Sequence, residues 1–231
     1  MKTRIAKFIA DSGIASRRVA EDLIARGAVF VNGTKLDTPV FFVNENDTVV
    51  VNGKKINTQN GTKLYAFHKP INTMTTRTDP SGRKTIYDCL PDEYKNLKYI
   101  GRLDYKTTGL LLMTNDGELA RKMTLPSSHI PRTYIATVYG DLSKLDLARH
   151  GLTIRGVKYA PMKIDIIDDK HLRVEIDEGK KNEVRIVLSA IGAPVKKLHR
   201  ISFGKIELGN IPVGKIREIN QKTIDLILKS F

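Results

Sequence analysis

One stretch near the middle of the chain sets charged residues against an apolar run: GRLDYKTTGLLLMTND, residues 101–116. Arg102 and Asp104 stand two positions apart, and the apolar run over 109–113 that follows them has the composition of a buried strand. A carboxylate held beside such a strand can act as a general base or as a covalent nucleophile. It can also be an ordinary turn residue with Arg102 as its salt-bridge partner. The residue types alone leave both interpretations open.

Other common catalytic patterns do not occur in the sequence. There is no Cys/His pair with zinc spacing, no G-x-x-x-x-G-K phosphate loop, no G-x-G-x-x-G after a strand and no G-x-S-x-G elbow. Cys89 is the single cysteine, which excludes an internal disulfide framework. The five histidines are scattered along the chain, and we expect each to be an ordinary surface or hydrogen-bonded residue. Most cofactor-dependent classes of enzyme therefore lose support.

The chain is strongly basic. Its 231 residues include 39 Lys and Arg against 25 Asp and Glu, which gives a formal net charge of +14. Such an excess favours a polyanionic partner, although a generally basic, solvated surface would have the same composition. The N-terminus lacks the apolar stretch of a signal peptide, and no segment approaches the roughly 20 apolar residues that span a bilayer. These features predict a cytoplasmic protein with no membrane partner.

The elements that must position these residues fall into two blocks. The first block, residues 1–58, opens with Ile5, Phe8 and Ile9 on one helical face, and Ser16 is placed to cap a second helix that ends at Gly27. The residues of this second helix that we expect to point inward are Val19, Leu23 and Ile24. The block thus begins with two short helices.

Short strands and a linker complete the first block. Asn-Gly pairs at 32–33 and 52–53 predict hairpin turns between runs that are rich in Val and Phe. The polar segment that follows lacks apolar periodicity, so we expect a linker at about 57–62.

The second block, residues 63–231, alternates strand and helix patterns. The predicted strands are 64–67, 109–114, 134–139, 163–167, 172–176 and 195–206, and the predicted helices are 118–123, 143–150, 181–191 and 221–228. Strands outnumber helices, and most neighbouring strands look connected by hairpins. This pattern predicts an α+β fold in which helices flank a mixed, mainly antiparallel sheet.

The first block resembles the small alpha-L RNA-binding module, which takes its name from the fourth protein of the small ribosomal subunit. The Ser-Arg-Arg element at 16–18, the Leu-Ile-x-x-Gly element at 23–27 and the Val-Asn-Gly element at 31–33 match that module in order. By this resemblance, Arg17 and Arg18 would lie along an RNA backbone. The module occurs in many unrelated proteins, so it indicates the class of partner and leaves the reaction open.

The second block resembles the bacterial pseudouridine synthases of the RsuA/RluB branch, which act on ribosomal RNA and usually carry an alpha-L module. The residues that carry this resemblance are Gly101-Arg-Leu-Asp104 with 108–117, Lys69-Pro70 with 79–91, Pro131-Arg-Thr-Tyr134, and 178–185 ending at Arg185. The resemblance covers nearly the whole chain. It implies isomerisation of a uridine within RNA without a metal, nucleotide or redox cofactor.

The resemblance also implies roles for individual residues. Asp104 would be the essential carboxylate, as nucleophile or as base. Arg185 would pair with Asp104 and keep it charged, unless it instead forms a surface ion pair with Glu178 or Glu183. Tyr134 would stack on the target uracil, unless it is an ordinary core residue.

Further residues of the second block would bind the RNA. Arg102 would fill the space of an extruded base or hold a phosphate, because a base inside folded RNA must leave its stack before an enzyme can reach it. Leu198 would support the base from below. Lys197 and Arg200 beside it would meet phosphates, although a solvated basic edge strand would explain these two residues almost as well.

The expected partner is therefore ribosomal RNA or an assembling ribosomal subunit. Asp-Pro-Ser-Gly-Arg at 79–83 and Asn-Asp-Gly-Glu-Leu-Ala at 115–120 favour large-subunit RNA. The alternatives are a non-enzymatic RNA-binding or ribosome-assembly protein on the same fold, and a hydrolase that releases free uracil. No coiled-coil pattern or obvious interface segment occurs, so we expect a monomer.

Overall fold

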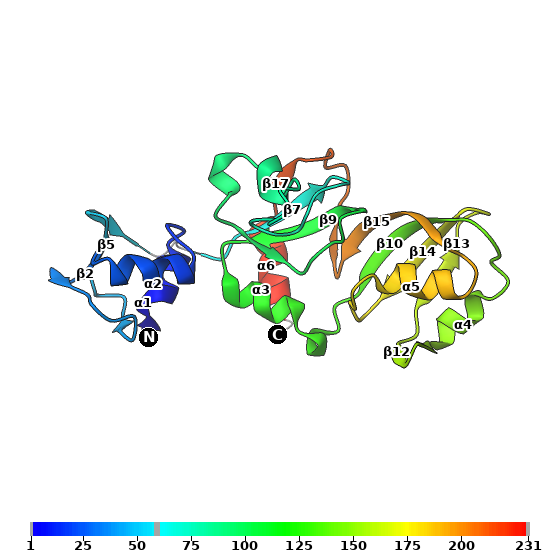
Figure 1. Ribbon diagram of the computed structural model, residues 1–231, viewed down its shortest axis with the longest axis horizontal. Helices are drawn as coiled ribbons and strands as arrows, with labels where there is room; N and C mark the ends of the chain where they lie inside the picture. The colour runs from blue at the N-terminus through cyan, green and yellow to red at the C-terminus, as the bar shows by residue number, and fades with distance from the viewer. Residues whose placement is uncertain (1, 58–60, 230–231) are drawn as a thin grey trace.

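The N-terminal part of the chain folds as two packed helices with short strands. The computed structural model describes residues 2–57 and 61–229, and Figure 1 shows the N-terminal part at its left. The helices are α1 (Ile5–Asp11) and α2 (Arg17–Ala25). The strands are β1 (Thr3–Arg4), β2 (Val29–Val31), β3 (Thr34–Lys35), β4 (Phe42–Val43), β5 (Val49–Val51) and β6 (Lys54–Ile56). They form a sheet of order β3-β2-β5-β6 and a separate pair, β1-β4.

Helix α2 begins where the sequence predicts. The Ser16 hydroxyl accepts a hydrogen bond from the backbone N–H of Val19 at 3.3 Å, which satisfies one of the free donors of the first turn. The predicted inward face is wrong at one position, because Val19 is 45% exposed and Ala20 is buried instead. Ala20 and Ile24 lie about one turn apart, so they share the face that packs into the core with α1.

Both Asn-Gly pairs make tight hairpin turns. Asn32 and Gly33 have φ angles of 50° and 83°, and Asn52 and Gly53 have φ angles of 49° and 75°. Positive φ at both central residues suits the twist of antiparallel strands, and Asn and Gly tolerate it. The turns join β2 to β3 and β5 to β6. The central residues of the predicted linker, 58–60, lie outside the described part of the chain.

One large sheet organises the rest of the chain. Its strands are β7 (Leu64–Lys69), β8 (Lys98–Ile100), β9 (Thr107–Thr114), β10 (Arg132–Val138), β13 (Lys163–Ile166), β14 (His171–Ile176), β15 (Val195–Phe203), β16 (Ile206–Glu207) and β17 (Ile216–Glu218). The order is β13-β14-β10-β15-β9-β7-β17, with β8 paired to β9 and β16 paired to β15. Strands β9 and β15 run parallel, and the other pairs are antiparallel. The prediction of a mixed, mainly antiparallel sheet is confirmed.

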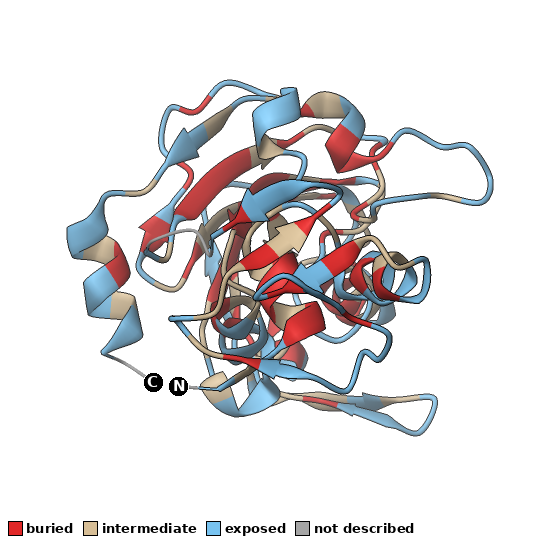
Figure 2. Ribbon diagram, turned by 90° about the vertical axis from the view of Figure 1, so that its left-hand side faces the viewer, coloured by how far each residue is buried: buried red, intermediate tan, exposed pale blue. Residues whose placement is uncertain are grey.

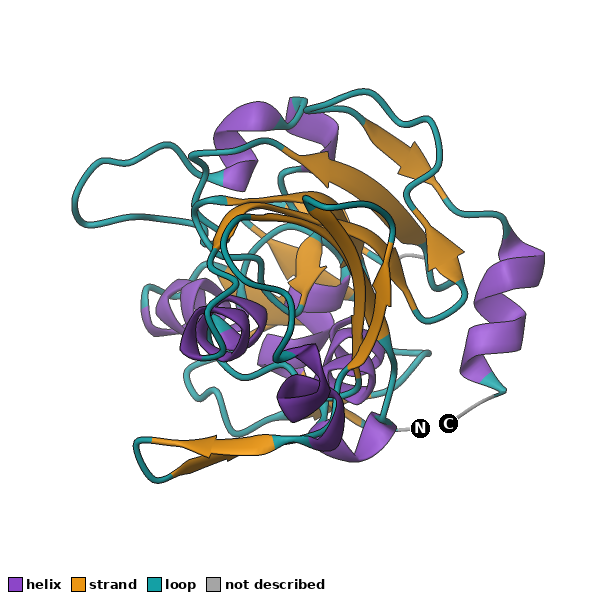
Figure 3. Ribbon diagram, turned by 90° about the vertical axis from the view of Figure 1, so that its right-hand side faces the viewer, coloured by secondary structure: helices purple, strands orange, loops and turns teal. Residues whose placement is uncertain are grey.

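Helices pack on both faces of this curved sheet (Figure 3). They are α3 (Gly117–Thr124), α4 (Leu145–His150), α5 (Glu183–Ala190) and α6 (Gln221–Leu228). Leu110 and Leu112 share a core with α3 and α6, whereas Leu111 and Met113 belong to the core that includes α4 and α5. Alternate residues of one strand thus enter opposite cores. Figure 2 shows buried residues concentrated along the strands and on the inner sides of the helices.

Several short elements were not predicted from the sequence. They are β1, β8, β17, the hairpin β11 (Leu152–Ile154) with β12 (Val157–Tyr159), and the 3₁₀ turns Ile86–Cys89, Asp92–Tyr94 and Pro126–Ser128. Such short elements are too brief to show a period. The predicted extended segment 195–206 is two strands, because Gly204 takes a φ of 56° and turns the chain from β15 into β16.

Gly109 allows the parallel strands to approach closely. Its φ is +102°, and a Cβ at this position would lie 2.2 Å from the carbonyl oxygen of Arg200. Only a residue without a side chain fits between β9 and β15 at this point. No helix within 2–57 or 61–229 has the length and apolar character that crossing a membrane requires.

Candidate active site

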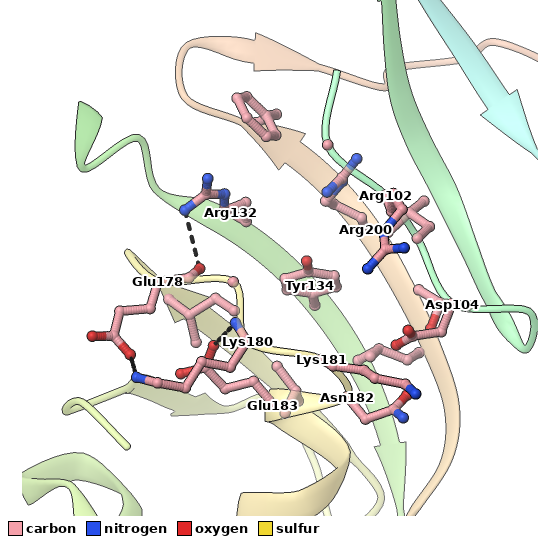
Figure 4. A pocket seen from close by; sticks show the side chains of 18 of the residues that line it. Arg102, Asp104, Arg132, Tyr134, Glu178, Lys180, Lys181, Asn182, Glu183 and Arg200 are labelled. Carbon is pink, nitrogen blue, oxygen red and sulfur yellow. Dashed lines mark hydrogen bonds and ion pairs between the residues drawn. The ribbon is translucent and has the colours of Figure 1, made fainter. Parts of the chain in front are cut away.

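A pocket lies on the face of the sheet that carries Tyr134 (Figure 4). Leu198 also lines this pocket. It is lined by the loop before β9, by parts of β10 and β15, and by the segment 178–184 that leads into α5. Its volume is about 460 Å³. This volume lies within the range of roughly 300–1,000 Å³ that is usual for sites of small ligands.

Asp104 lies half-buried at the wall of this pocket, in the loop between β8 and β9. The Thr75 hydroxyl donates to the carbonyl oxygen of Leu103 at 2.8 Å and accepts from its N–H at 3.3 Å. The N–H of Asn72 donates to the carbonyl oxygen of Tyr105 at 2.9 Å. Both neighbours of Asp104 are thus anchored, while its carboxylate forms no hydrogen bond or ion pair within the described residues.

Arg102 also lines the pocket, and its side chain is exposed. It forms no ion pair with Asp104, so the structure does not contain the local salt bridge that was the simplest alternative for these two charges. Figure 4 shows Arg102, Asp104 and Tyr134 around the same opening. The geometry leaves both charged groups available to a ligand.

Lys69 is buried directly behind the loop that carries Asp104. Its ammonium group donates to the carbonyl oxygens of Pro70 at 3.0 Å and Thr107 at 2.9 Å. Burial lowers the pKa of Lys69 to about 8, and the negative charge of Asp104 opposes part of that effect. Lys69 therefore ties the end of β7 to the start of β9 and places a positive charge near the carboxylate.

Arg185 projects from the first half of α5 towards the same loop. Its Nη1 donates to the carbonyl oxygen of Val195 at 3.0 Å, and its Nη2 donates to that of Lys106 at 3.2 Å. Burial lowers the pKa of Arg185, and the charge of Asp104 opposes this effect. Arg185 thus lies within electrostatic reach of Asp104, but its hydrogen bonds go to the backbone on either side of the site.

The alternative partners proposed for Arg185 are engaged elsewhere. Lys180 forms an ion pair with Glu178, and the backbone N–H of Lys180 donates to the Glu183 carboxylate at 2.8 Å (Figure 4). Burial raises the pKa of Glu183, and the hydrogen bond from Lys180 opposes this rise. Neither glutamate pairs with Arg185, so the alternative of a surface ion pair is not observed.

Tyr134 and Leu198 sit on the face of the sheet that forms the pocket floor. Tyr134 is opposite Arg200 in the β10–β15 ladder, and Leu198 is opposite Ala136. Leu198 also pairs with Thr107 across the parallel ladder, which brings it close to the Asp104 loop. β15 is a central strand, so the solvated edge strand suggested for Lys197 and Arg200 is not observed.

A β-bulge gathers three further side chains at the same floor. The register of β10 and β15 shifts between Thr133 and Tyr134, so that Arg132 faces Phe203 while Tyr134 faces Arg200. The guanidinium carbons of Arg132 and Arg200 lie 5.1 and 5.3 Å from the centre of the Phe203 ring. The extra residue of the bulge turns Arg200 and Phe203 to one face, as bulges beside active sites often do.

The structure places the predicted residues in two groups. Those that line the pocket are Arg102, Asp104, Tyr134, Leu198 and Arg200. Those outside its lining are Arg185, Lys197, Arg17 and Arg18. Sequence reasoning assigned no role to Arg132, Thr107 or Phe203, all of which line the pocket. Of these, Arg132 had a usable signal, because residues two apart on a strand share a face and Tyr134 was already a candidate.

No group of three or more His, Cys, Asp or Glu side chains within 2–57 and 61–229 is arranged to hold a metal ion. His68 and His199 are neighbours, with ring centres 5.3 Å apart, although they are far apart in sequence. Burial lowers the pKa of His199, and His68 adds to the effect. His199 lies between Leu198 and Arg200, so it points to the opposite face of the sheet from the pocket.

Comparison with known families agrees with this fold. The family model of RNA pseudouridylate synthases matches residues 63–190, and the model of the S4 domain matches residues 3–49. The chain therefore belongs to the RNA pseudouridine synthase family and carries an N-terminal S4 domain. The resemblance inferred from the sequence is confirmed.

Individual relatives extend over almost the whole chain. A protein of Aquifex aeolicus named as an uncharacterized RNA pseudouridine synthase is 39% identical over 100% of this chain and 95% of its own length. The ribosomal large subunit pseudouridine synthase B of Bacillus subtilis is 36% identical over 94% of this chain and 91% of its own. A crystal structure of a pseudouridylate synthase has a TM-score of 0.69 at 27% identity, covering 97% of this chain and 99% of that one.

Proposed function

We propose that this enzyme converts a uridine of large-subunit ribosomal RNA to pseudouridine, with Asp104 as its essential carboxylate. The observation that carries the proposal is the state of Asp104: its neighbours are anchored, and its carboxylate is unpaired inside a pocket that Tyr134 and Leu198 also line. The similarity to the Bacillus subtilis large-subunit enzyme supports the choice of RNA.

The reaction requires one bond to break and another to form. The bond between N1 of uracil and C1′ of the ribose breaks, the base rotates, and C5 bonds to C1′. C5 then loses its proton and N1 gains one, so that the product is an isomer of the substrate. Asp104 can serve this sequence as nucleophile at C1′ or as base. Tyr134 stacks on the base, and Leu198 supports the base from below.

A basic groove supports RNA as the substrate. It has a volume of about 690 Å³ and lies between the N-terminal helices and α3. Its charged lining is mainly cationic and consists of Lys7, Arg17, Arg77, Lys98, Arg121, Asp11 and Glu118. Such a groove suits a phosphate backbone. Arg18 is exposed next to Arg17 on α2 and extends this surface.

We infer two domains, residues 1–58 for docking RNA and 63–231 for catalysis. The separation of the buried cores supports this division. One core contains residues only from 5–56, and two others contain residues only from 64–227. An ion pair of 3.6 Å between Asp11 and Lys98 links the two parts.

The Asp104→Asn variant tests the proposal. Asparagine keeps the shape of the side chain and removes its charge, so we expect no pseudouridine on transcripts of large-subunit ribosomal RNA. Affinity for the same RNA should stay within a few-fold of that of the wild type. Small-subunit transcripts should remain unmodified by either protein. Undiminished turnover by Asp104→Asn would show that the reaction does not need the Asp104 carboxylate. Modification of small-subunit RNA alone would overturn the choice of substrate.

A further inference from the structure

We propose that Arg200 receives the negative charge of the uracil base once the glycosidic bond has broken, by donating a hydrogen bond to a carbonyl oxygen of the detached base. This inference rests on the proposed function. It assigns to Arg200 a role different from the phosphate contact that the sequence predicts.

Burial separates Arg200 from the exposed cations of the pocket. Arg200 is 2% exposed, whereas Arg102 and Lys181 at the same pocket are exposed. Phosphates carry charges that remain largely hydrated at the outside of a folded RNA, so they meet exposed cations at the rim. A buried cation on the pocket floor can be reached only by the part of the nucleotide that enters the pocket, which is the base.

The guanidinium of Arg200 also has an unused donor. Its Nε donates to the carbonyl oxygen of Leu110 at 2.7 Å, but its Nη2 is buried and has no hydrogen-bond partner. A buried donor without a partner destabilises the fold, and the penalty is larger when the donor is charged. Arg200 lines the pocket, so a partner that arrives with the substrate is in a position to satisfy this donor.

The position of this donor matches the base. Arg200 is directly opposite Tyr134 in the β10–β15 ladder, and cross-strand neighbours on one face have Cβ atoms about 4.5–5.5 Å apart. A base stacked on Tyr134 therefore has Arg200 along its edge. Phe203, which lies 5.3 Å from the guanidinium carbon, limits the directions that the side chain can take.

The charge balance favours an anion at this end of the pocket. Arg200 forms no ion pair with any described carboxylate. Its charged neighbour is Arg132, and the charge of Arg200 contributes to lowering the pKa of Arg132. Arg132 is held by carbonyl oxygens of Asp177 and Glu178, so its Nη1 is already used. The carboxylates of Glu183 and Asp177 act on Arg132, whereas no described carboxylate forms an ion pair with Arg200 beside Tyr134.

The chemistry supplies such an anion at one stage. When the bond between N1 and C1′ breaks, its electron pair stays with the base and is shared between N1 and the two carbonyl oxygens. The charge disappears when C5 bonds to C1′, and the later loss of the C5 proton is balanced by protonation of N1. A donor fixed beside those oxygens binds the detached base more strongly than the intact uridine, which is the condition for accelerating the step.

Arg200→Gln and Arg200→Lys test the inference in single-turnover reactions. We expect Arg200→Gln to slow conversion of bound RNA by about 100-fold, as loss of one such donor does elsewhere. RNA affinity should change less than about threefold, whereas loss of a phosphate contact would weaken binding and reduce the salt dependence. Arg173→Gln removes an exposed arginine of β14 and should leave the rate unchanged. Arg200→Lys keeps the buried charge and takes the place of Arg200→Gln in the test if the glutamine variant does not fold.

Modified substrates identify the contact. Replacing O2 or O4 of the target uracil by sulfur gives a weaker hydrogen-bond acceptor at that position. The ratio of the wild-type rate to the Arg200→Gln rate should therefore be smaller for one of the two thio-substituted RNAs than for the unmodified RNA. An equal advantage for uridine, 2-thiouridine and 4-thiouridine would overturn the inference, as would weaker RNA binding at an unchanged rate. Wild-type protein that makes no pseudouridine would contradict the proposed function instead.

Discussion

Arg185 donates a hydrogen bond from Nη2 to the carbonyl oxygen of Lys106 at 3.2 Å. Lys106 lies two residues after Asp104, so the bond ties α5 to the loop that carries the carboxylate. The other end of the guanidinium donates to Val195 at the start of β15. One side chain thus joins three segments around the pocket and adds a positive charge within reach of Asp104.

We expect Arg185→Lys to lower kcat by about 100-fold, because an ammonium group cannot reproduce the planar pair of donors and a displacement near 1 Å is enough for such a loss. RNA affinity should change little. Arg149→Lys is a matched control, since Arg149 donates to the carbonyl oxygen of Ile164 away from the pocket. Equal kcat values for the two variants would show that Arg185 does not position the site.

Tyr134→Phe and Tyr134→Ala should separate the ring from the hydroxyl. The phenylalanine variant keeps the stacking surface, so substrate affinity should be retained, and a fall in kcat would assign a role in the reaction to the hydroxyl. The alanine variant loses stacking worth about 1–3 kcal/mol and should lower kcat/KM by roughly 10- to 100-fold. Tyr139→Phe, at an exposed position, is the control. Unchanged kcat/KM for Tyr134→Ala would show that Tyr134 does not contact the substrate and is an ordinary core residue.

Replacing Arg17 and Arg18 together by Gln should weaken RNA binding at every target sequence. Each lost phosphate contact reduces the slope of log affinity against log salt by about 1. The double variant should therefore lose roughly 1–2 in slope, measured by RNA binding between low and moderate salt. Lys158→Gln with Lys170→Gln removes the same charge from exposed positions of the catalytic part and should leave the slope unchanged. Identical slopes for both double variants would show that the RNA backbone does not contact Arg17 and Arg18.

Lys69 should make stability depend on pH in a defined window. Burial lowers its pKa to about 8 from an ordinary 10.5, so between these values the unfolded chain binds more protons than the folded chain. The free energy of unfolding of wild type, relative to Lys69→Met, should be constant below pH 8 and rise towards pH 10.5. The full rise is roughly 3 kcal/mol. Urea unfolding at successive pH values measures it, and a flat difference would refute the burial of a charged Lys69.

Gly109→Ala should destabilise the fold by about 2–5 kcal/mol, because it combines an unfavourable φ with a Cβ that meets the backbone of Arg200. Gly156→Ala isolates the first effect, since Gly156 has a φ of +79° and nothing lies within 4 Å of its Cβ position. It should cost only about 1–2 kcal/mol. Thermal or denaturant unfolding of both variants gives the comparison, and equal losses would mean that the two strands separate easily.

Much of the site was predictable because its residues stand in short, local patterns. Asp104 stands next to a strand that is apolar on both faces, and Ser16 precedes a helical period, so both positions follow from neighbouring residues. Tyr134 likewise lies on a strand of clear alternation. The family resemblance then assigned roles that spacing alone leaves open.

What the sequence could not show depends on contacts between distant segments. Arg200 looked like one of several surface cations, because nothing in its own neighbourhood reveals that β15 is inserted between β9 and β10. The bulge that sets Phe203 beside Arg132 is likewise a property of two strands together. The predicted burial of Val19 was wrong for a simpler reason. Both Val19 and Ala20 fit a helical period, and the smaller residue, Ala20, is the one packed in the core with α1.

The parallel pairing of β9 with β15 also sets the order in which this molecule can be completed. The two strands are about ninety residues apart in the chain, and the crossing includes β10, β14 and α5. During synthesis the N-terminal segment can fold while the rest is still being made, since domains generally fold as units from the N-terminus. The pocket has no floor until β15 emerges and inserts. A nascent chain should therefore acquire the ability to hold RNA well before it acquires the ability to modify it.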